Sequence, residues 1–243
     1  MVVQRLFNLV KRINRAKNLG LDYHRAAEFN IPNSLLINGD RKTVSLPQEY
    51  GVKVAFIEIL LDDCYGLEKL SQPILKILDI GANVGLFSIA ARHRFPQAVI
   101  HAYEPNPYLE KHLQIQARAA GFDYFMEAVG REDGKVSLDF HEDSVQTRSR
   151  VNEAGEFSQV AFSKAIERMG GSVDLAKVDC EGAEWLLFQE PETWQLVQNL
   201  SLEYHLWPDH KHEEIPNLIQ NLGFQIKKQI PIEDYGLLLA SRQ

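Results

Sequence analysis

Short apolar runs alternate with segments of helical periodicity between residues 74 and 222. The runs are continuous and rich in Ile, Leu and Val, as is typical of strands buried on both faces, whereas the segments between them carry apolar residues at helical spacing. This alternation predicts an α/β fold, in which helices cover both faces of a mostly parallel sheet. The strands are expected at 74–80, 99–103, 122–129, 135–141, 173–178 and 200–204, and the helices at 84–93, 108–120, 162–169, 182–189 and 213–222.

Two further apolar segments, 224–232 and 235–240, follow with only a polar turn at Glu233 and Asp234 between them. Strands so close in sequence cannot be joined by a right-handed helical crossover. They are therefore expected to pair antiparallel at the edge of the sheet.

The first part of the chain has a different pattern and predicts a small N-terminal cap over residues 1–70, followed by a main domain over residues 71–243. Residues 1 to about 30 look helical, and Pro32 ends that segment because proline cannot continue a helix. The junction between the two parts is expected near Pro73.

A hairpin is predicted inside the cap. Asn38 and Gly39 stand between the short segments 34–37 and 43–46, and both residue types tolerate the positive φ of a tight turn. The next apolar run, 52–61, fits either a helix or a strand.

The composition narrows the protein class without naming a function. Of 243 residues, 45% are hydrophobic and 24% are charged, as in a soluble globular protein. The net charge of -7 argues against a large nucleic-acid interface. The chain has two cysteines, Cys64 and Cys180, and they form no C-x-x-C motif, which excludes a disulfide framework and a cysteine-based zinc site. This cysteine usage fits a reducing compartment, so we expect a cytoplasmic protein.

Basic residues interrupt the apolar positions of the first helix, so this segment predicts neither a secretory signal nor a membrane span. Such a helix more often packs on its own domain or on a partner chain than on an anionic membrane. A homodimer through the N-terminal segment is therefore one open alternative.

The strand at 74–80 leads through Asp79 into a turn bracketed by Gly81 and Gly85. Glycine allows the backbone to bend sharply or to approach a ligand, and the helix that follows presents free N–H groups at its start. The pattern predicts a cofactor loop, with a ligand-free strand-to-helix turn as the alternative.

Polar residues also follow the other predicted strands. In an open parallel sheet, ligands bind beyond the carboxyl ends of the strands, next to the point where the strand order reverses. These strand ends carry Asp79, Glu104, Glu127, Asp179, Glu181, Glu203 and His205.

Glu104 stands 23 positions after Gly81, close to the spacing of about 20 at which an acidic residue binds ribose hydroxyls in nucleotide-binding folds. A dinucleotide loop would have glycine at the positions of Asn83 and Leu86. The loop therefore fits a cofactor that has a ribose but no pyrophosphate.

Four ordered motifs in this sequence resemble those of FkbM-type methyltransferases: residues 79–87, 102–106, 128–130 and 177–184. The resemblance covers about residues 52–240. It implies a Rossmann-like class I methyltransferase with a seven-stranded sheet, S-adenosylmethionine as cofactor, and methyl transfer to hydroxyl groups of sugars, macrolides or other small metabolites. It also implies that the cap contributes to the acceptor pocket.

The resemblance assigns roles to individual residues. It implies that the methionine part of the cofactor lies against Asp79, Gly81, Asn83 and Gly85, that the ribose lies against Glu104 with Pro105 and Asn106 beside it, and that adenine lies near Glu127 and Ala128.

Methyl transfer to an alcohol releases a proton, and His205 is the candidate base because the pKa of histidine lies near neutrality. Asp179 is expected to orient the acceptor hydroxyl, to bind a divalent cation with Glu181 or Glu203, or to cap the helix after Gly182. Sequence leaves the metal open. A second group is expected to roof the cofactor: Asp62, Asp63 and Tyr65.

An O-methyltransferase acting on a small hydroxylated substrate is thus the main hypothesis. The alternatives are methylation of a peptide or protein, an NAD-linked oxidoreductase, which Asn83 disfavours, and a non-catalytic scaffold with a cofactor fold.

Overall fold

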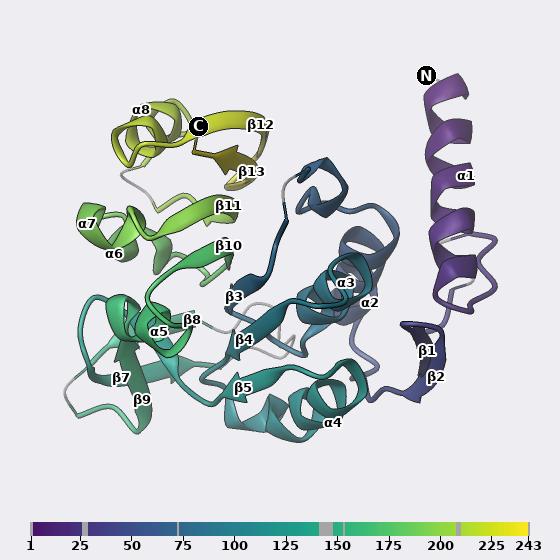
Figure 1. The fold of residues 1–243 in the computed structure, drawn as a ribbon, viewed down its shortest axis with the longest axis horizontal. Helices are drawn as coiled ribbons and strands as arrows, with labels where there is room; N and C mark the ends of the chain where they lie inside the picture. Colours follow the sequence, from purple (N-terminus) through teal and green to yellow (C-terminus); the bar gives the residue numbers. More distant parts are fainter. Residues whose placement is uncertain are drawn as a thin grey trace.

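The computed structural model describes residues 2–25, 29–71, 73–140, 148–152, 154–207 and 210–242. A seven-stranded sheet runs through its centre in the order β12-β13-β11-β10-β3-β4-β5 (Figure 1). Its strands are β3 (Lys76–Ile80), β4 (Val99–Tyr103), β5 (Asp123–Phe125), β10 (Val173–Val178), β11 (Val197–His205), β12 (Gln225–Ile232) and β13 (Tyr235–Ser241).

All neighbouring strands of this sheet are parallel except for the two pairs that contain β13. The predicted fold is confirmed: a Rossmann-like, mostly parallel seven-stranded sheet with an antiparallel C-terminal edge. From β3 the chain builds outward to β4 and β5, and it then returns to place β10 on the other side of β3. The strand order therefore reverses between β3 and β10, and the crevice of such a sheet lies there.

Helices cover both faces of the sheet (Figure 1). Successive strand residues point to opposite faces, so Ile77 packs in the core on one face and Leu78 in the core on the other. The helices after β3 are α3 (Leu86–Arg94), α4 (Glu110–Ala120), α5 (Phe162–Arg168), α6 (Glu184–Leu187), α7 (Pro191–Trp194) and α8 (Glu214–Asn221), and a 3₁₀ turn, η4 (Pro107–Leu109), precedes α4.

The N-terminal segment packs on the face that carries α3 and α4, and its buried apolar residues belong to the same core. Its elements are α1 (Val2–Asn18), β1 (Ser34–Ile37), β2 (Asp40–Thr43), α2 (Tyr50–Phe56), a π-helical turn η2 (Ile57–Leu61) and a 3₁₀ turn η3 (Leu67–Lys69). The division into a cap, 1–70, and a main domain, 71–243, stays a prediction.

Two expectations for the cap need correction. The first helix ends at Asn18, not near residue 30, because the chain turns at Gly20 with φ of 71°. The predicted hairpin turn at Asn38 and Gly39 is present, with φ of 52° and 87°, but its second strand begins at once and is β2, not residues 43–46.

The prediction of a single strand at 122–129 is wrong, because residues 126–127 separate β5 from β6 (Ala128–Gly130), and these two strands belong to different sheets. A second, four-stranded sheet has the order β6-β9-β7-β8 and contains β7 (Gly134–Asp139), β8 (Arg148–Val151) and β9 (Phe157–Ala161). The sequence pattern missed β8, β9 and α7. The polar composition of residues 141–155 predicts a loop, and β8 lies within it, while residues 141–147 and 153 lie outside the described residues.

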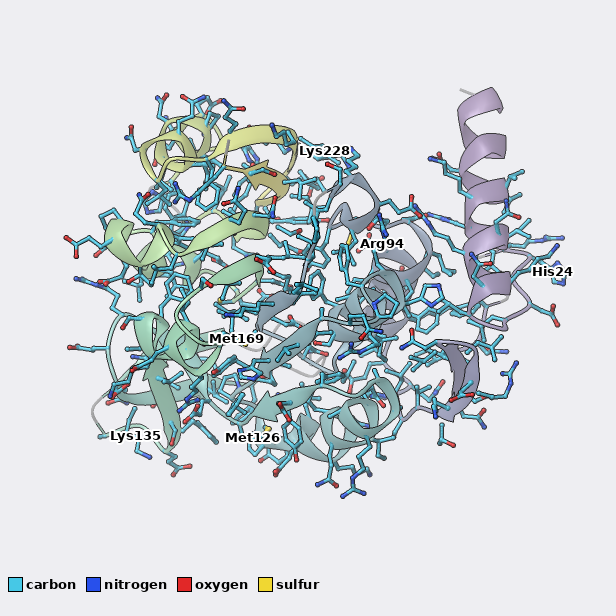
Figure 2. The ribbon with its side chains drawn as sticks, in the orientation of Figure 1. His24, Arg94, Met126, Lys135, Met169 and Lys228 are labelled. Carbon is cyan, nitrogen blue, oxygen red and sulfur yellow. The ribbon has the colours of Figure 1, made fainter. Side chains whose placement is uncertain are left out.

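Side chains cover the sheet and its helices densely (Figure 2). In the described part of the chain, no helix combines the length and the apolar character needed to cross a lipid bilayer.

Candidate active site

A cavity of about 580 Å³ lies at the carboxyl ends of β3, β4, β10 and β11, and α2 and η2 form its opposite wall. This is the edge at which the predicted residues were expected to meet. Ten of them line the cavity: Gly81, Asn83, Glu104, Pro105, Glu127, Ala128, Asp179, Glu181, Glu203 and His205.

The loop after β3 packs tightly against the end of β10. Gly81 has φ of 73°, and a Cβ atom at this position would overlap the carbonyl oxygen of Asp179. The N–H groups of Gly81 and Ala82 both donate to the carbonyl oxygen of Tyr103, at 3.0 and 2.9 Å. A glycine is therefore required here both by the backbone conformation and by the close approach of a neighbouring strand.

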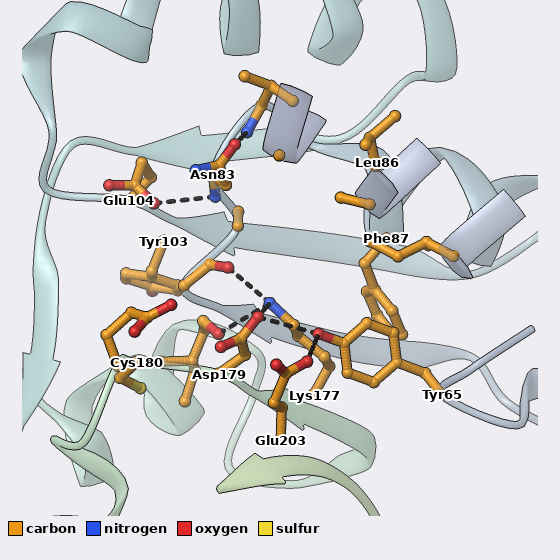
Figure 3. A pocket seen from close by; sticks show the side chains of 18 of the residues that line it. Tyr65, Asn83, Leu86, Phe87, Tyr103, Glu104, Lys177, Asp179, Cys180 and Glu203 are labelled. Atoms are coloured by element: carbon orange, nitrogen blue, oxygen red, sulfur yellow. Dashed lines mark hydrogen bonds and ion pairs between the residues drawn. The ribbon is translucent and has the colours of Figure 1, made fainter. Parts of the chain in front are cut away.

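Glu104 holds the next part of the loop (Figure 3). Its Oε2 accepts from the N–H of Asn83 at 2.8 Å, and its Oε1 accepts from the N–H of Asn106 at 2.9 Å. Burial raises the pKa of Glu104 to about 7, although these two hydrogen bonds oppose the shift. Because each carboxylate oxygen has a further lone pair, Glu104 can also accept two hydroxyl groups of a ligand.

Glu127, which follows β5, and Ala128, the first residue of β6, form another wall of the cavity. The carboxylate of Glu127 forms an ion pair with Arg168, and the guanidinium carbon of Arg168 lies 4.9 Å from the centre of the Phe125 ring. Tyr103, also in the cavity wall, stacks on Phe125 with ring centres 4.8 Å apart. This arrangement gives the cavity an aromatic and partly charged side next to Glu104.

At the opposite end, Tyr65 joins two carboxylates. Its hydroxyl lies 2.9 Å from Asp179 Oδ2 and 3.1 Å from Glu203 Oε2. A phenol has one proton, so it donates to only one of them at a time. Burial and, after it, the charge of Asp179 raise the pKa of Glu203 to about 8.

His205 is surrounded by carboxylates. Its Nδ1 lies 3.3 Å from Glu184, and its Nε2 lies 3.6 Å from Glu181 and 3.9 Å from Glu203. Burial lowers the pKa of His205. The hydrogen bond and the charge of Glu184, and after them the charges of Asp179 and Glu181, raise it by more, so that the pKa is about 10. The raised pKa favours the imidazolium form, in which His205 donates to these carboxylates, and its role as a base stays a prediction.

One cluster has the spacing that a metal ion would need. Asp179, Glu181 and His205 each offer one ligand atom, and these atoms lie within 4.8 Å of one another. However, the carboxylate of Asp179 already accepts from Tyr65 and lies 3.5 Å from the ammonium of Lys177. Tyr65 and Lys177 therefore partly neutralise the charge of Asp179 within this cluster.

Three predicted cofactor residues do not reach the cavity. Asp79 is fully buried and accepts from the hydroxyl of Ser88 at 2.6 Å. Gly85 begins α3 and packs toward α4, while the side chain of Asn106 accepts from the N–H of Tyr108 at 3.0 Å. Asp79 lies on the same face of the sheet as its register partner Lys177, and the ammonium of Lys177, 3.4 Å from Asp79 Oδ1, lines the cavity in its place. The other two residues stabilise turns.

The expected roof is also only partly present. Tyr65 lines the cavity, but Asp62 binds Arg12 of α1, with N···O distances of 2.6 and 2.5 Å. Asp63 accepts from the N–H groups of Leu67 and Glu68 and so holds the start of η3. Neither aspartate lines the cavity.

Lys177 is a site residue that the sequence reasoning did not single out. It lines the cavity with a relative exposure of 2%, and it lies directly beside Asp79 in the register of β10 and β3. The available signal was a cation next to the buried end of a strand that is otherwise apolar from Leu175 to Val178, and an acid at the corresponding place in β3.

Comparison with known proteins agrees with these observations. The family model of the methyltransferase FkbM domain matches residues 79–226. The chain belongs to the FkbM methyltransferase family. The resemblance found in the sequence motifs is thereby confirmed.

Two curated relatives of this FkbM-family chain come from fungi. Methyltransferase sdnD of Sordaria araneosa is 27% identical over 263 residues, which cover 89% of this chain and 99% of that protein. Methyltransferase 1 of Beauveria bassiana (strain ARSEF 2860) is 26% identical over 215 residues, which cover 74% of this chain and 84% of that protein.

Solved structures with a similar fold are more distant in sequence. Aeropyrum pernix fibrillarin, determined with natively bound S-adenosyl-L-methionine, is 12% identical, with a TM-score of 0.49 and coverage of 85% of this chain and 92% of that chain. An O-methyltransferase family protein from Burkholderia thailandensis is 13% identical, with a TM-score of 0.48 and coverage of 78% and 58%.

The family match begins at the end of β3 and includes β11, so it contains the predicted site residues from Asp79 to His205. The wall contributed by α2, η2 and Tyr65 lies before it. The wall of the cavity opposite the strand ends is therefore built by a segment that precedes the family match.

Proposed function

We propose that this protein transfers a methyl group from S-adenosylmethionine to a hydroxyl group of a small metabolite or sugar. The observation that carries the proposal is a single cavity with two chemically different ends. One end consists of the glycine loop, Glu104 and Glu127, and the other gathers Tyr65 and several carboxylates around His205. The first suits a nucleoside-containing cofactor, and the second suits a hydroxyl group that loses a proton.

The first end fits S-adenosylmethionine for two reasons. Glu104 keeps lone pairs free for two ribose hydroxyls, and Asn83 occupies the position at which a pyrophosphate-binding loop has glycine. S-adenosylmethionine supplies a methyl group on a positively charged sulfur, and the neutral thioether product is a good leaving group. The carboxylates of Asp179, Glu181 and Glu203 favour such a positive charge nearby.

The acceptor is proposed to lie between the carboxylates and the cap. The cap side of the cavity is mainly apolar and includes Tyr50, Val54, Ala55 and Ile59. A small molecule with an apolar face toward this wall would direct a hydroxyl group toward Asp179 and Glu203, as alignment for in-line displacement requires. With the cofactor bound, its sulfonium would supply the methyl group, and the hydroxyl proton would pass to Asp179 or to the ionised form of Glu203.

The first test is binding. S-adenosylhomocysteine, the product of the cofactor, should bind the purified protein with one site per chain, as measured by isothermal titration calorimetry. NAD should leave the melting temperature unchanged. The opposite pattern would support the oxidoreductase alternative, and no binding of either compound would favour a scaffold.

The second test identifies the reaction. The protein should transfer a labelled methyl group from S-adenosylmethionine to members of a panel of hydroxylated metabolites and glycosides, and mass spectrometry should place the added mass on oxygen. Parallel reactions with peptides, with EDTA and with added Mg²⁺ separate the remaining alternatives. Label that appears only on peptides, or on nitrogen or carbon, would contradict the proposal, and loss of activity in EDTA that Mg²⁺ restores would assign a metal to Asp179, Glu181 and His205.

A further inference from the structure

The ammonium of Lys177 connects the end of β10 with the glycine loop (Figure 3). It donates to the carbonyl oxygen of Gly81 at 2.5 Å and to that of Ile80 at 3.3 Å. It also lies 3.4 Å from Asp79 Oδ1 and 3.5 Å from Asp179 Oδ2. One buried cation thus contacts the backbone of the loop and two carboxylates on neighbouring strands.

The loop itself needs such support. Gly81 and Asn83, two residues apart, both have positive φ, and for the asparagine this conformation costs about 1 kcal/mol or more. The N–H groups of the loop are held by Tyr103 and Glu104. Lys177 provides the complementary contact, because it holds the carbonyl side of the same turn.

We propose that Lys177 is a positioning residue that fixes residues 80–82 in the conformation that accepts the cofactor. The inference rests on the proposed function and adds a specific residue to it. By binding the carbonyls of Ile80 and Gly81, the ammonium fixes the orientation of the peptide groups on both sides of Gly81. The N–H groups of Gly81 and Ala82 then remain on Tyr103, and the loop surface facing the cavity keeps one shape.

A simpler role for Lys177 would be to neutralise Asp79 and Asp179. The two roles differ in their consequences. Charge balance alone would affect the stability of the whole domain, whereas loop positioning would also change the mobility of the loop and its affinity for the cofactor. Ser88 offers a matched control, because its hydroxyl donates to the other oxygen of Asp79 and not to the loop carbonyls.

The experiment compares Lys177→Met with Ser88→Ala at a temperature at which both variants are folded. Amide hydrogen exchange of Gly81 and Ala82 in the ligand-free protein should be about tenfold faster or more in Lys177→Met and unchanged in Ser88→Ala, given the strength of hydrogen bonds from a charged donor. The dissociation constant of S-adenosylhomocysteine should rise by a similar factor in Lys177→Met only. In a turnover assay, the KM for S-adenosylmethionine should rise while the KM for the acceptor stays the same.

Unchanged exchange at Gly81 and Ala82 in Lys177→Met would overturn the inference, whatever the protein binds. If the wild-type protein does not bind S-adenosylhomocysteine, the proposed function fails, but the exchange result still decides the role of Lys177. If Lys177→Met does not fold, a double variant that combines Lys177→Met with Asp79→Asn removes both charges. This double variant is then compared with the single variant Asp79→Asn. The double variant should show faster loop exchange and weaker binding, and equal behaviour of the two, or failure of the double variant to fold, would overturn the inference.

Discussion

The glycine loop permits a sharp comparison between two glycines with nearly the same backbone conformation. Gly81 has φ of 73° and Gly121, at the end of α4, has φ of 70°. A Cβ at Gly81 would overlap the carbonyl oxygen of Asp179, whereas nothing lies within 4 Å of a Cβ at Gly121. Replacing each with alanine therefore separates backbone strain from steric overlap.

The expected magnitudes differ accordingly. Alanine in the left-handed region costs about 1–2 kcal/mol, which should be the whole effect of Gly121→Ala. Gly81→Ala adds an overlap with main-chain atoms, for which about 1–3 kcal/mol is typical, and the total is about 2–5 kcal/mol. In a domain of this size, about 1 kcal/mol changes the melting temperature by about 2–4 °C.

Thermal unfolding with and without S-adenosylhomocysteine measures both effects. At a ligand concentration of about 100 times the dissociation constant, binding should stabilise the wild-type protein and Gly121→Ala by about 2.7 kcal/mol. Gly81→Ala should lose this stabilisation because the loop moves away from Asp179. A Gly81→Ala protein that unfolds at the same temperature as Gly121→Ala and keeps the full ligand-induced increase would refute the steric reasoning.

Three further predictions concern separate parts of the molecule. Burial raises the pKa of Glu104 to about 7 in the ligand-free protein, and its ionised form accepts two ribose hydroxyls, so the affinity for S-adenosylhomocysteine should rise with pH up to about 7 and then level off. The Glu104→Gln variant should bind more weakly, and its affinity should not depend on pH. Calorimetry from pH 5.5 to 8.5 checks this, and a wild-type affinity that falls as the pH rises would contradict it. Tyr65→Phe keeps the edge contact with Phe87 but removes the hydroxyl between Asp179 and Glu203. Initial-rate kinetics should therefore show a loss of about tenfold or more in kcat, while the affinity for S-adenosylhomocysteine stays the same. Equal losses in kcat and in this affinity would point to a structural role. Arg92→Met removes hydrogen bonds to two carbonyl groups at the end of α4 and to that of Pro96 after α3. It should lower the free energy of unfolding by about 2–4 kcal/mol in urea denaturation, without changing S-adenosylhomocysteine affinity in the folded protein.

Many elements were predictable because their residues carry local information. The strands β4 and β10 have the predicted bounds, since each is a mainly apolar run that is followed directly by an acidic residue, Glu104 or Asp179. The predicted hairpin turn at Asn38 and Gly39 followed from residue types that adopt positive φ. In contrast, β8 and β9 belong to a second sheet whose pairing depends on distant segments, and their sequences lack a clear periodic pattern.

The candidate site shows the same division. The sequence by itself determined that Gly81, Glu104, Asp179 and His205 lie at one edge of the sheet, because parallel strands bring their carboxyl ends together. It also determined the family, because the motifs on these strand ends are local strings of residues.

Only the tertiary structure decided which of these groups interact and in what charge state. Strand register placed Lys177 beside Asp79, and the packing of the cap placed Tyr65 between Asp179 and Glu203. The carboxylates around His205 come from separate elements, and together they raise its pKa to about 10, which the spacing of these residues along the chain does not reveal. The physical reason is that electrostatic interactions depend on distances through space and on burial, and neither quantity is encoded by spacing along the chain.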